Sequence, residues 1–416
     1  MRTRTQRPRV VVLGAGFAGV AAVKALKGAP VDVTLVDRNG YNTFQPLLYQ
    51  VATGGLNPGD VTYAARALTG RQANVGFRKG DVVGVDVATR EVTLSHGARI
   101  GYDYLVIATG VTTNYFGVPG AAEHAMAMYT RDQALSVRDD LFGKLERLAQ
   151  AVAAGERDED PTVVVVGAGA TGVEMAGSLA EMGNTAMPVA YPELAHRRAR
   201  VILAEMGPHV LAPFHPKLRE YTARELRERG VDLRLNTAVK AVHSDGVELD
   251  DGERIHAGTV IWAAGVTAPD IVKKWGLPQG RNGRVEVGAD LSLAGHPEVF
   301  VVGDLGVDPS DPLPQLAQPA IQGGKHAARQ ILRLTGGEVA QDFHYFDKGI
   351  MATIGRGSAI AELRGGVRLR GVLAWLAWLV LHILSLLGGR NRLVTMLNLS
   401  ARYLTWPRNL NVIVGD

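Results

Sequence analysis

One ten-residue pattern occurs twice in this chain and constrains its fold more than any other feature. Val-Val-Val-Leu-Gly-Ala-Gly-Phe-Ala-Gly spans residues 10–19, and Val-Val-Val-Val-Gly-Ala-Gly-Ala-Thr-Gly spans residues 163–172. Each copy joins a β-branched run, which is typical of a buried strand, to three glycines at a fixed spacing. The repeat therefore predicts two similar domains, either in succession or with one nested inside the other.

The first copy has the chemistry of a dinucleotide-binding turn. Its glycines are Gly14, Gly16 and Gly19. In such a turn the first glycine allows the tight bend, the second lets the backbone approach a pyrophosphate, and the third lets a helix pack on the strand. We expect that helix over 20–26, with its N-terminus facing the phosphates. Asp37 ends the next strand, 31–36, where its carboxylate can accept a hydrogen bond from a ribose hydroxyl. A purely structural glycine turn is the alternative.

The second copy predicts a second dinucleotide site. Its glycines are Gly167, Gly169 and Gly172. Glu205 follows a β-branched run but lies 36 residues after Gly169, whereas the usual spacing is about 20. We expect residues 184–200 to form a loop insertion that accounts for the excess. Met206 comes next, where a site for a 2′-phosphate would favour an arginine, so the sequence predicts NADH rather than NADPH.

Three other strands run into turns of small residues, at 104–110, 260–265 and 299–304. Such turns allow a cofactor to approach the backbone closely. The residues predicted to contact cofactor there are Thr109, Gly110, Gly265, Gly303 and Asp304. Strands alternate with Ala-rich helical stretches throughout, which predicts an α/β protein with parallel sheets and two Rossmann-like domains. The two sites predict one tightly bound redox dinucleotide, FAD, and one diffusible nicotinamide nucleotide.

The chain of 416 residues contains no cysteine. This excludes a disulfide scaffold, a thiolate zinc site, a cysteine-ligated iron–sulfur cluster and a redox-active dithiol. The 11 histidines show no metal-ligand spacing, so no catalytic metal is expected. Nucleic acid is not expected either, because it favours a broader basic surface with base-stacking groups.

The C-terminal region is both apolar and basic. Residues 372–387 are apolar almost all round, but they are fewer than the roughly 20 needed to span a bilayer. A second stretch, 392–406, is amphipathic. The polar and aromatic stripes are expected at Trp375, Trp378, His382 and Ser385, and at Arg392, Thr395, Asn398, Arg402 and Thr405. We expect a peripheral membrane anchor at the cytoplasmic face of the cell membrane. A transmembrane helix and a buried dimer interface are the alternatives.

Several stretches together resemble a known family. They are 44–55, 172–177 and 314–327, with Ala-Gln-Pro-Ala-Ile-Gln at 317–322 matching the pattern Ala-Gln-x-Ala-x-Gln. The chain resembles the two-dinucleotide-binding-domain flavoproteins and, more narrowly, type II NADH dehydrogenase, the non-proton-pumping NADH:quinone oxidoreductase. The missing cysteines exclude the mechanisms of related enzymes that pass electrons through thiols, such as glutathione reductase and sulfide:quinone oxidoreductase.

This resemblance implies FAD-dependent oxidation of NADH with reduction of a membrane quinone, in a homodimer. It implies an FAD domain over 8–125 and 285–345, an NADH domain over 126–284, and a C-terminal membrane-associated region over 346–416. Ala317 would lie near the cofactor, and Gln318 and Gln322 would hydrogen-bond the quinone carbonyl from one face of a helix that starts near Pro319.

The glutamines could instead make structural caps. Glu174 would help to position NADH and to deliver protons, with favourable charge at a helix N-terminus as the alternative. Two other functions also remain open at this point. One is NADH-dependent reduction of a soluble electron carrier, and the other is a redox-sensing interaction module.

Overall fold

The computed structural model describes residues 7–156 and 161–405, the last four of these as backbone only. The chain forms two compact units. Unit 1 contains residues up to 42, 63–112 and 266–347, and unit 2 contains 43–62, 113–265 and the residues from 348 on. Most of unit 2 is thus inserted within unit 1, which confirms the nested α/β organisation. The predicted domain boundaries group the residues differently and stay a prediction.

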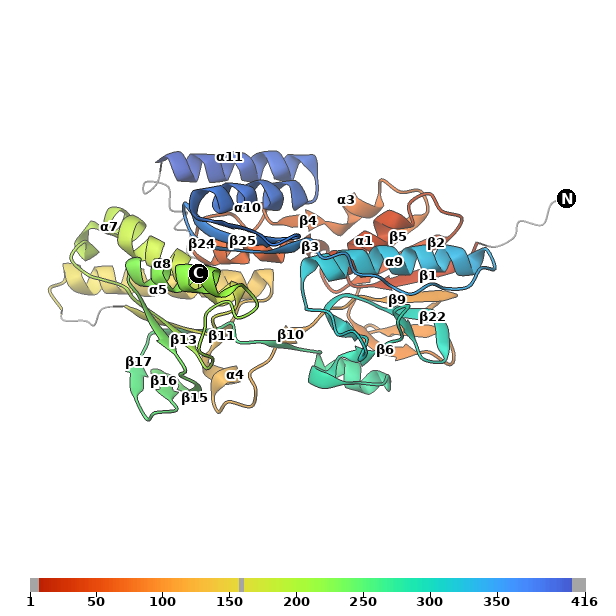
Figure 1. Ribbon diagram of the computed structural model, residues 1–416, viewed down its shortest axis with the longest axis horizontal. Helices are drawn as coiled ribbons and strands as arrows, with labels where there is room; N and C mark the ends of the chain where they lie inside the picture. The colour runs from red at the N-terminus through yellow and green to blue at the C-terminus, as the bar shows by residue number, and fades with distance from the viewer. Residues whose placement is uncertain (1–6, 157–160, 406–416) are drawn as a thin grey trace. The chain divides into compact units, whose positions relative to one another are not determined.

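Unit 1 is built on a six-stranded sheet in the order β21-β22-β9-β1-β2-β5 (Figure 1). All neighbours are parallel except β21 and β22. The strands are β1 (Arg9–Leu13), β2 (Asp32–Asp37), β5 (Val75–Lys79), β9 (Tyr104–Ile107), β21 (Ser292–Leu293) and β22 (His296–Val301). A smaller antiparallel sheet contains β6 (Val82–Asp86), β7 (Glu91–Leu94) and β8 (Arg99–Gly101). Residues 10–13 of β1 are buried, which explains the unbroken run of valines, because parallel strands are covered on both faces.

Two helices of unit 1 pack closely on each other, namely α1 (Phe17–Ala25) and α9 (Ala317–Thr335). Their approach depends on Gly324, because a Cβ there would overlap the carbonyl oxygen of Ala18. Both helices begin before the predicted positions. The turn at Gly16 caps α1 in extended backbone, and Leu316 caps α9. These extended residues, rather than the first strong helix former, fix where each helix starts.

Unit 2 holds a five-stranded parallel sheet in the order β11-β18-β12-β13-β14. Its strands are β11 (Met126–Ala127), β12 (Thr162–Val166), β13 (Arg200–Glu205), β14 (Val231–Leu235) and β18 (Thr259–Trp262). The hairpins β15 (Val239–His243), β16 (Gly246–Leu249) and β17 (Arg254–His256) form a small sheet beside it. Between residues 113 and 265, the longer helices of this unit are α5 (Arg131–Ala153), α6 (Ala170–Glu181) and α8 (Pro216–Glu228).

The segment 184–200 is not the simple loop that the sequence suggests. A π-helical turn (Met182–Ala186) extends α6, and α7 (Met187–Ala190) and a 3-10 turn (Pro192–Leu194) follow. Buried Met187 and Leu194 explain this order, because apolar side chains that pack on the domain hold the chain in helical turns.

The C-terminal part of unit 2 is a three-stranded antiparallel sheet followed by two helices. Its elements are β24 (Gly349–Gly355), β25 (Ser358–Leu363), β26 (Val367–Arg370), α10 (Gly371–Ser385) and α11 (Gly389–Thr405). Helix α6 lies against β24, where a Cβ at Gly177 would overlap the carbonyl oxygen of Ile354. The shorter helices and strands are α2 (Leu48–Ala52), α3 (Ala65–Thr69), α4 (Ala121–His124), β3 (Tyr41–Thr43), β4 (Thr62–Ala64), β10 (Thr112–Thr113), β19 (Val266–Thr267), β20 (Val285–Glu286) and β23 (Gly306–Val307).

Candidate functional site

The first glycine turn of unit 1 leaves space in front of a helix. Gly14 has φ of 98°, which favours glycine. A Cβ on Gly19 would overlap the carbonyl oxygen of Gly14, so both residues are needed for the turn itself. Gly16 differs, because no atom lies within 4 Å of the position its Cβ would take. The open side therefore lies at the N-terminal cap of α1, which is the shape and polarity that a pyrophosphate requires.

Asp37 is fixed at the end of β2 by two backbone donors. Its Oδ2 accepts from the Ala15 N–H at 2.6 Å and its Oδ1 accepts from the Asn39 N–H at 2.7 Å. Burial raises the pKa of Asp37, and the two hydrogen bonds oppose that shift. The carboxylate is thus held beside the glycine turn with lone pairs left for a ribose hydroxyl.

The second turn, in unit 2, repeats this geometry closely. Gly167 also has φ of 98°, a Cβ on Gly172 would overlap the carbonyl oxygen of Gly167, and Gly169 has open space. Glu205 Oε2 accepts from the Ala168 N–H at 2.7 Å, and its Oε1 accepts from the Gly207 N–H at 2.8 Å. Glu205 therefore takes the place that Asp37 has in unit 1.

Other predicted cofactor contacts of unit 1 lie near its glycine turn. A Cβ on Gly14 would overlap the carbonyl oxygen of Ala108, and Thr109 is the next residue after Ala108. Its Oγ1 is buried with no hydrogen-bond partner among the described residues. Gly110 and Gly303 have φ of 70° and 73°, and a Cβ at Gly303 would lie 3.2 Å from the Ala18 Cβ. Asp304 sits in the turn after Gly303, and its carbonyl oxygen accepts from Arg284 Nε at 2.9 Å.

The two glutamines of α9 that were predicted to bind the quinone, Gln318 and Gln322, have different surroundings. Ala317 is the first residue of the helix, and Gln318 follows with its Oε1 buried and without a partner in the described part of the chain. Gln322 is engaged by backbone: its Nε2 donates to the Phe346 carbonyl at 2.9 Å, and its Oε1 accepts from the Phe346 N–H at 3.0 Å. Of these two glutamines, only Gln318 thus has an amide oxygen that lacks a partner among the described residues.

Glu174 lies on α6 and is buried, with 8% of its surface exposed. Burial raises its pKa to about 8. Its Oε1 accepts one hydrogen bond, from the Thr353 N–H of β24 at 3.3 Å, which partly offsets the effect of burial. This carboxyl group is therefore largely protonated at pH 7.

Gly265 follows β18 and is covered by an aromatic ring. A Cβ on Gly265 would lie 2.6 Å from Phe116 Cζ, and the Asn114 N–H donates to the Gly265 carbonyl at 2.9 Å. Sequence patterns could not single out Phe116, because no periodicity or motif connects it with Gly265. Thr353 was missed for the same reason, since it lies 179 residues from Glu174.

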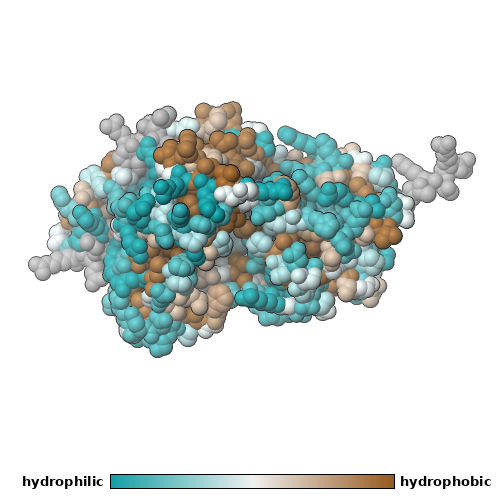
Figure 2. All heavy atoms as spheres, viewed as in Figure 1, coloured by the Kyte–Doolittle hydropathy of each residue, from teal (hydrophilic) through white to brown (hydrophobic). Residues whose placement is uncertain are grey.

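Helices α10 and α11 expose a continuous apolar surface, seen in brown in Figure 2. The exposed side chains are Val372, Leu373, Leu376, Val380, Leu381, Leu384, Leu393, Met396 and Leu397. None of the described helices combines the length and apolarity needed to cross a membrane. Within the predicted stripe, Trp378 faces inward: it is only 1% exposed and stacks on His382, with ring centroids 4.0 Å apart, whereas Ser385 is exposed.

The polar side of α11 also faces the protein. Thr395 Oγ1 donates to the Asp60 carbonyl at 3.2 Å, Asn398 Nδ2 donates to the Asp60 carboxylate at 2.9 Å, and Asn391 Nδ2 donates to the Thr62 carbonyl at 2.6 Å. The predicted stripe members Arg402 and Thr405 lie where side chains are not described. The helix thus turns Asn391, Thr395 and Asn398 inward, and Leu399 is buried as well, whereas Leu393 and Leu397 are exposed.

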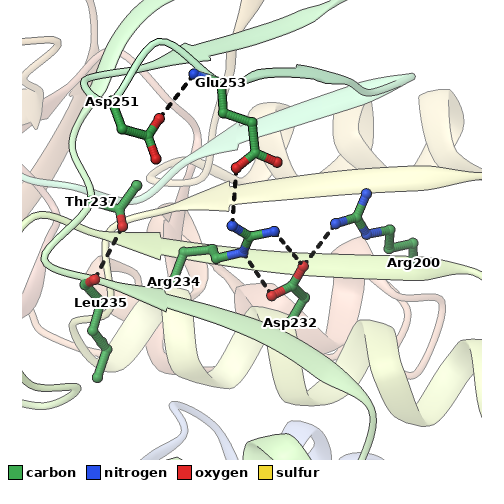
Figure 3. A network of polar contacts seen from close by, with 7 residues as sticks. All are labelled: Arg200, Asp232, Arg234, Leu235, Thr237, Asp251 and Glu253. Atoms are coloured by element: carbon green, nitrogen blue, oxygen red, sulfur yellow. Dashed lines mark hydrogen bonds and ion pairs between the residues drawn. The ribbon is translucent and has the colours of Figure 1, made fainter.

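Two further electrostatic features bear on ligands. In residues 7–156 and 161–405 no three His, Asp or Glu side chains are grouped so that they could hold a metal ion. In unit 2 the arginines near β14 are already paired (Figure 3). Arg234 Nε donates to Asp232 at 2.9 Å and its Nη1 donates to Glu253 at 3.1 Å, while Arg200 donates to Asp232 at 2.8 Å.

Comparisons with known proteins agree with this architecture. The family model for pyridine nucleotide-disulphide oxidoreductase matches residues 8–324. The type II NADH:quinone oxidoreductases NdhA and Ndh of Mycobacterium tuberculosis are 42% and 39% identical to this chain. Those matches cover 94% and 97% of this chain and 86% and 89% of the relatives. The structure of NDH2 from Plasmodium falciparum in complex with NADH is 19% identical, with a TM-score of 0.88 over 97% of this chain and all of that chain.

Proposed function

This chain belongs to the type II NADH:quinone oxidoreductases of the pyridine nucleotide-disulphide oxidoreductase family, and we propose that unit 1 holds its FAD and unit 2 its NADH. The reaction is oxidation of NADH and two-electron reduction of a quinone, here a membrane quinone and without proton pumping. The observation that carries the assignment of sites is the pair of matching turns, each with an open central glycine and a fixed carboxylate.

The residues of unit 1 fit FAD. Gly16 leaves room at the N-terminus of α1 for the pyrophosphate, and Asp37 is placed to accept from a ribose hydroxyl. The buried Thr109 Oγ1 lacks a partner that a bound cofactor can supply. When bound, FAD would supply the two-electron redox chemistry that connects NADH to the quinone. The chain's own task is to hold the flavin nucleotide in place and to exclude water from it.

The residues of unit 2 favour NADH over NADPH. Glu205 would accept from the 2′-hydroxyl of the adenosine ribose and would repel a 2′-phosphate. Arg234 is next to Leu235, the residue of β14 that pairs with Glu205, but Asp232 and Glu253 already bind its guanidinium. No arginine in this network is therefore left to neutralise a 2′-phosphate.

Glu174 is the residue that we assign to proton delivery. In the repeat, Gly172 corresponds to Gly19, so Glu174 corresponds to Ala21, which is also buried. The same fold thus forms with alanine at this position. Because burying a carboxyl group lowers stability, its presence in unit 2 favours a functional role. With Oε1 accepting from Thr353, the proton is best held at Oε2 and can be donated near pH 7.

Gln318 is proposed to bind the quinone carbonyl through its amide. A neutral amide donates a hydrogen bond without placing a fixed charge beside an apolar substrate. Gln322 binds the Phe346 backbone through both amide atoms. It would instead hold the start of α9 against the segment around Phe346. Replacing Gln318 should therefore slow quinone turnover more directly than replacing Gln322.

The apolar surface of α10 and α11 is proposed to lie in the interfacial layer of a membrane, which would bring the enzyme to its quinone. Its exposed leucines, such as Leu373 and Leu384, are 71% and 60% exposed. Arginines at 368, 370, 390 and 392 lie before and after α10 and suit anionic lipid headgroups. A Leu373→Glu/Leu384→Glu variant should lose binding to lipid vesicles while it keeps NADH-to-flavin electron transfer.

The test of the proposed function is steady-state NADH oxidation by the FAD-loaded protein, with and without a short-chain quinone, repeated with NADPH. A large quinone-dependent rate with NADH and a small one with NADPH is the expected result. Fast flavin reduction without acceleration by quinone would leave the fold assignment standing and would favour a soluble electron carrier as acceptor. Gln318→Leu that retained full quinone turnover would remove Gln318 from the quinone site.

A further inference from the structure

Phe116 has an unusual conformation for an aromatic residue. Its φ is 53°, in the left-handed region that favours glycine, and its side chain is 60% exposed. A bulky residue in this region is strained, and such strain persists only where the surroundings hold it. Exposure of a large ring to water brings no compensating burial. The conformation therefore needs a reason other than stability.

A set of hydrogen bonds holds the strained turn on the end of β18. The Phe116 N–H donates to Asn114 Oδ1 at 2.8 Å, and the Asn114 N–H donates to the Gly265 carbonyl at 2.9 Å. Trp262 Nε1 donates to the Asn114 carbonyl at 2.8 Å. Asn114 thus links the turn to Trp262, the last residue of β18, and to Gly265, which follows that strand. The ring of Phe116 is held over Gly265.

The position of that ring can be read from the order of the strands. In unit 2, β12 carries the glycine turn and lies between β13 and β18. Glu205 at the end of β13 marks the side of the adenosine ribose. The pyrophosphate is expected at the N-terminus of α6, which follows β12. The other half of the dinucleotide then extends toward the end of β18, where a Cβ on Gly167 would lie 2.5 Å from Ala264 Cα and where Phe116 covers the next residue.

We propose that the Phe116 ring forms the surface against which the nicotinamide half of NADH packs, and that Asn114 positions this ring. The inference rests on the proposed NADH site of unit 2 and adds to it a residue that the sequence patterns did not indicate. An aromatic ring offers a flat apolar face to the nicotinamide, and the strained turn holds that face ready before NADH arrives. Gly265 is then a glycine because the ring occupies the place of its side chain.

Two NADH fragments separate this role from a structural one. ADP-ribose contains the adenosine half and lacks nicotinamide, whereas NADH contains both. For Phe116→Ala in the FAD-loaded full chain, we expect the Kd of NADH from anaerobic rapid-mixing reduction to rise roughly three- to tenfold. The inhibition constant of ADP-ribose should stay within about twofold of the wild-type value. Phe116→Tyr should restore the NADH Kd, because it keeps the ring.

Asn114→Ala should give an intermediate rise in the NADH Kd, because it loosens the turn without removing the ring. Phe116→Gly serves as the second ring-free variant, since glycine accepts a φ of 53° and the fold is then relieved of strain. The matched control is Val189→Ala, another exposed apolar residue of unit 2, which should change neither constant. Reoxidation of the chemically reduced enzyme by a short-chain quinone should be unchanged in all variants.

Three results would overturn the role of Phe116. The NADH Kd could stay at the wild-type value in both ring-free variants, it could fall because the ring merely covers the site, or the constants for NADH and ADP-ribose could rise together. A wild-type protein whose flavin NADH does not reduce would instead overturn the proposed function itself. The two failures are therefore distinct.

Discussion

The two glycine turns, one in each unit, are nearly identical, yet the helices that follow them serve different purposes. In both, the first glycine has φ of 98°, the third packs on the carbonyl of the first, and an acid accepts from the residue between the first two glycines. Beyond the turn the helices diverge. Helix α1 packs on another helix, α9, whereas α6 packs on a strand, β24. The shared part is what a dinucleotide needs, whereas the element that packs on the following helix differs between the two units.

The length of chain between the glycine turn and its acid also differs between the two units. The hydrogen-bonded pair is 22 residues apart in unit 1 and 37 residues apart in unit 2. The additional residues form the π-helical turn and α7, and they leave the acid in the same place. The position of the carboxylate relative to the sheet, and not its distance along the chain, is therefore the feature that both units share.

The largest expected effect comes from the third glycine of each turn. Gly19→Ala and Gly172→Ala should each destabilise their own unit by about 3 kcal/mol, because the new methyl group overlaps a carbonyl oxygen. Gly19→Ala should lose FAD on gel filtration and all activity. Gly172→Ala should keep the flavin absorbance and lose reduction by NADH. Equal loss of FAD in both variants would contradict the assignment of one nucleotide to each unit.

The middle glycines supply the control for that comparison. Gly16→Ala and Gly169→Ala introduce a methyl group with no atom within 4 Å. Thermal unfolding should therefore change little, by less than about 1 kcal/mol. Nucleotide binding should still weaken, because the methyl group points into the space assigned to a pyrophosphate.

The next effect concerns Glu174, the carboxyl group that replaces Ala21 of the other repeat. Its pKa of about 8 in the folded chain lies above its ordinary value of 4.5, so its contribution to stability is complete below pH 4.5 and is lost as pH rises through about 8. Glu174→Gln should consequently gain stability relative to wild type as pH rises through about 8, on the order of 2–4 kcal/mol at pH 9. Chemical denaturation at several pH values measures this difference.

Ala21→Val is a suitable control for this dependence of stability on pH, since it changes packing at the matching position without adding a titratable group. Its unfolding free energy should run parallel to that of the wild type across the whole pH range. If the Glu174→Gln curve were parallel as well, the folded chain would hold this carboxyl group with an ordinary pKa. The argument for a proton donor near pH 7 would then fail.

The smallest expected effect distinguishes the role of Glu205 from that of Asp37. Glu205→Gln keeps an acceptor for the Ala168 N–H but removes the charge, so the KM for NADH should rise about tenfold and the preference over NADPH should shrink. Asp37→Asn should weaken retention of FAD and leave that preference unchanged. The ratio of kcat/KM for the two nucleotides measures the effect. An unchanged ratio in Glu205→Gln would remove Glu205 from nucleotide selection.

The sequence predicts the parts of the site that local backbone geometry determines. Glycines of the two turns and their acids could be identified because spacing and strand ends fix their roles within a short stretch. The Phe346 partner of Gln322 and the Thr353 partner of Glu174 could not, because each depends on how distant segments pack. The inward position of Trp378 escaped prediction for the same reason: an apolar helix does not reveal which of its faces is covered.

The inverted polarity of α11 has a practical consequence for anyone preparing this enzyme in water. Deleting α10 and α11 is an obvious way to improve solubility, yet it would also remove the partners of Asp60 and Thr62, which Thr395, Asn398 and Asn391 supply. It would uncover the buried Tyr49, whose ring lies 6.3 Å from that of Trp378. A shortened chain would then report on a damaged segment 43–62 as well as on the loss of the exposed apolar surface of α10 and α11. Detergent or a lipid nanodisc around the complete chain avoids this confusion.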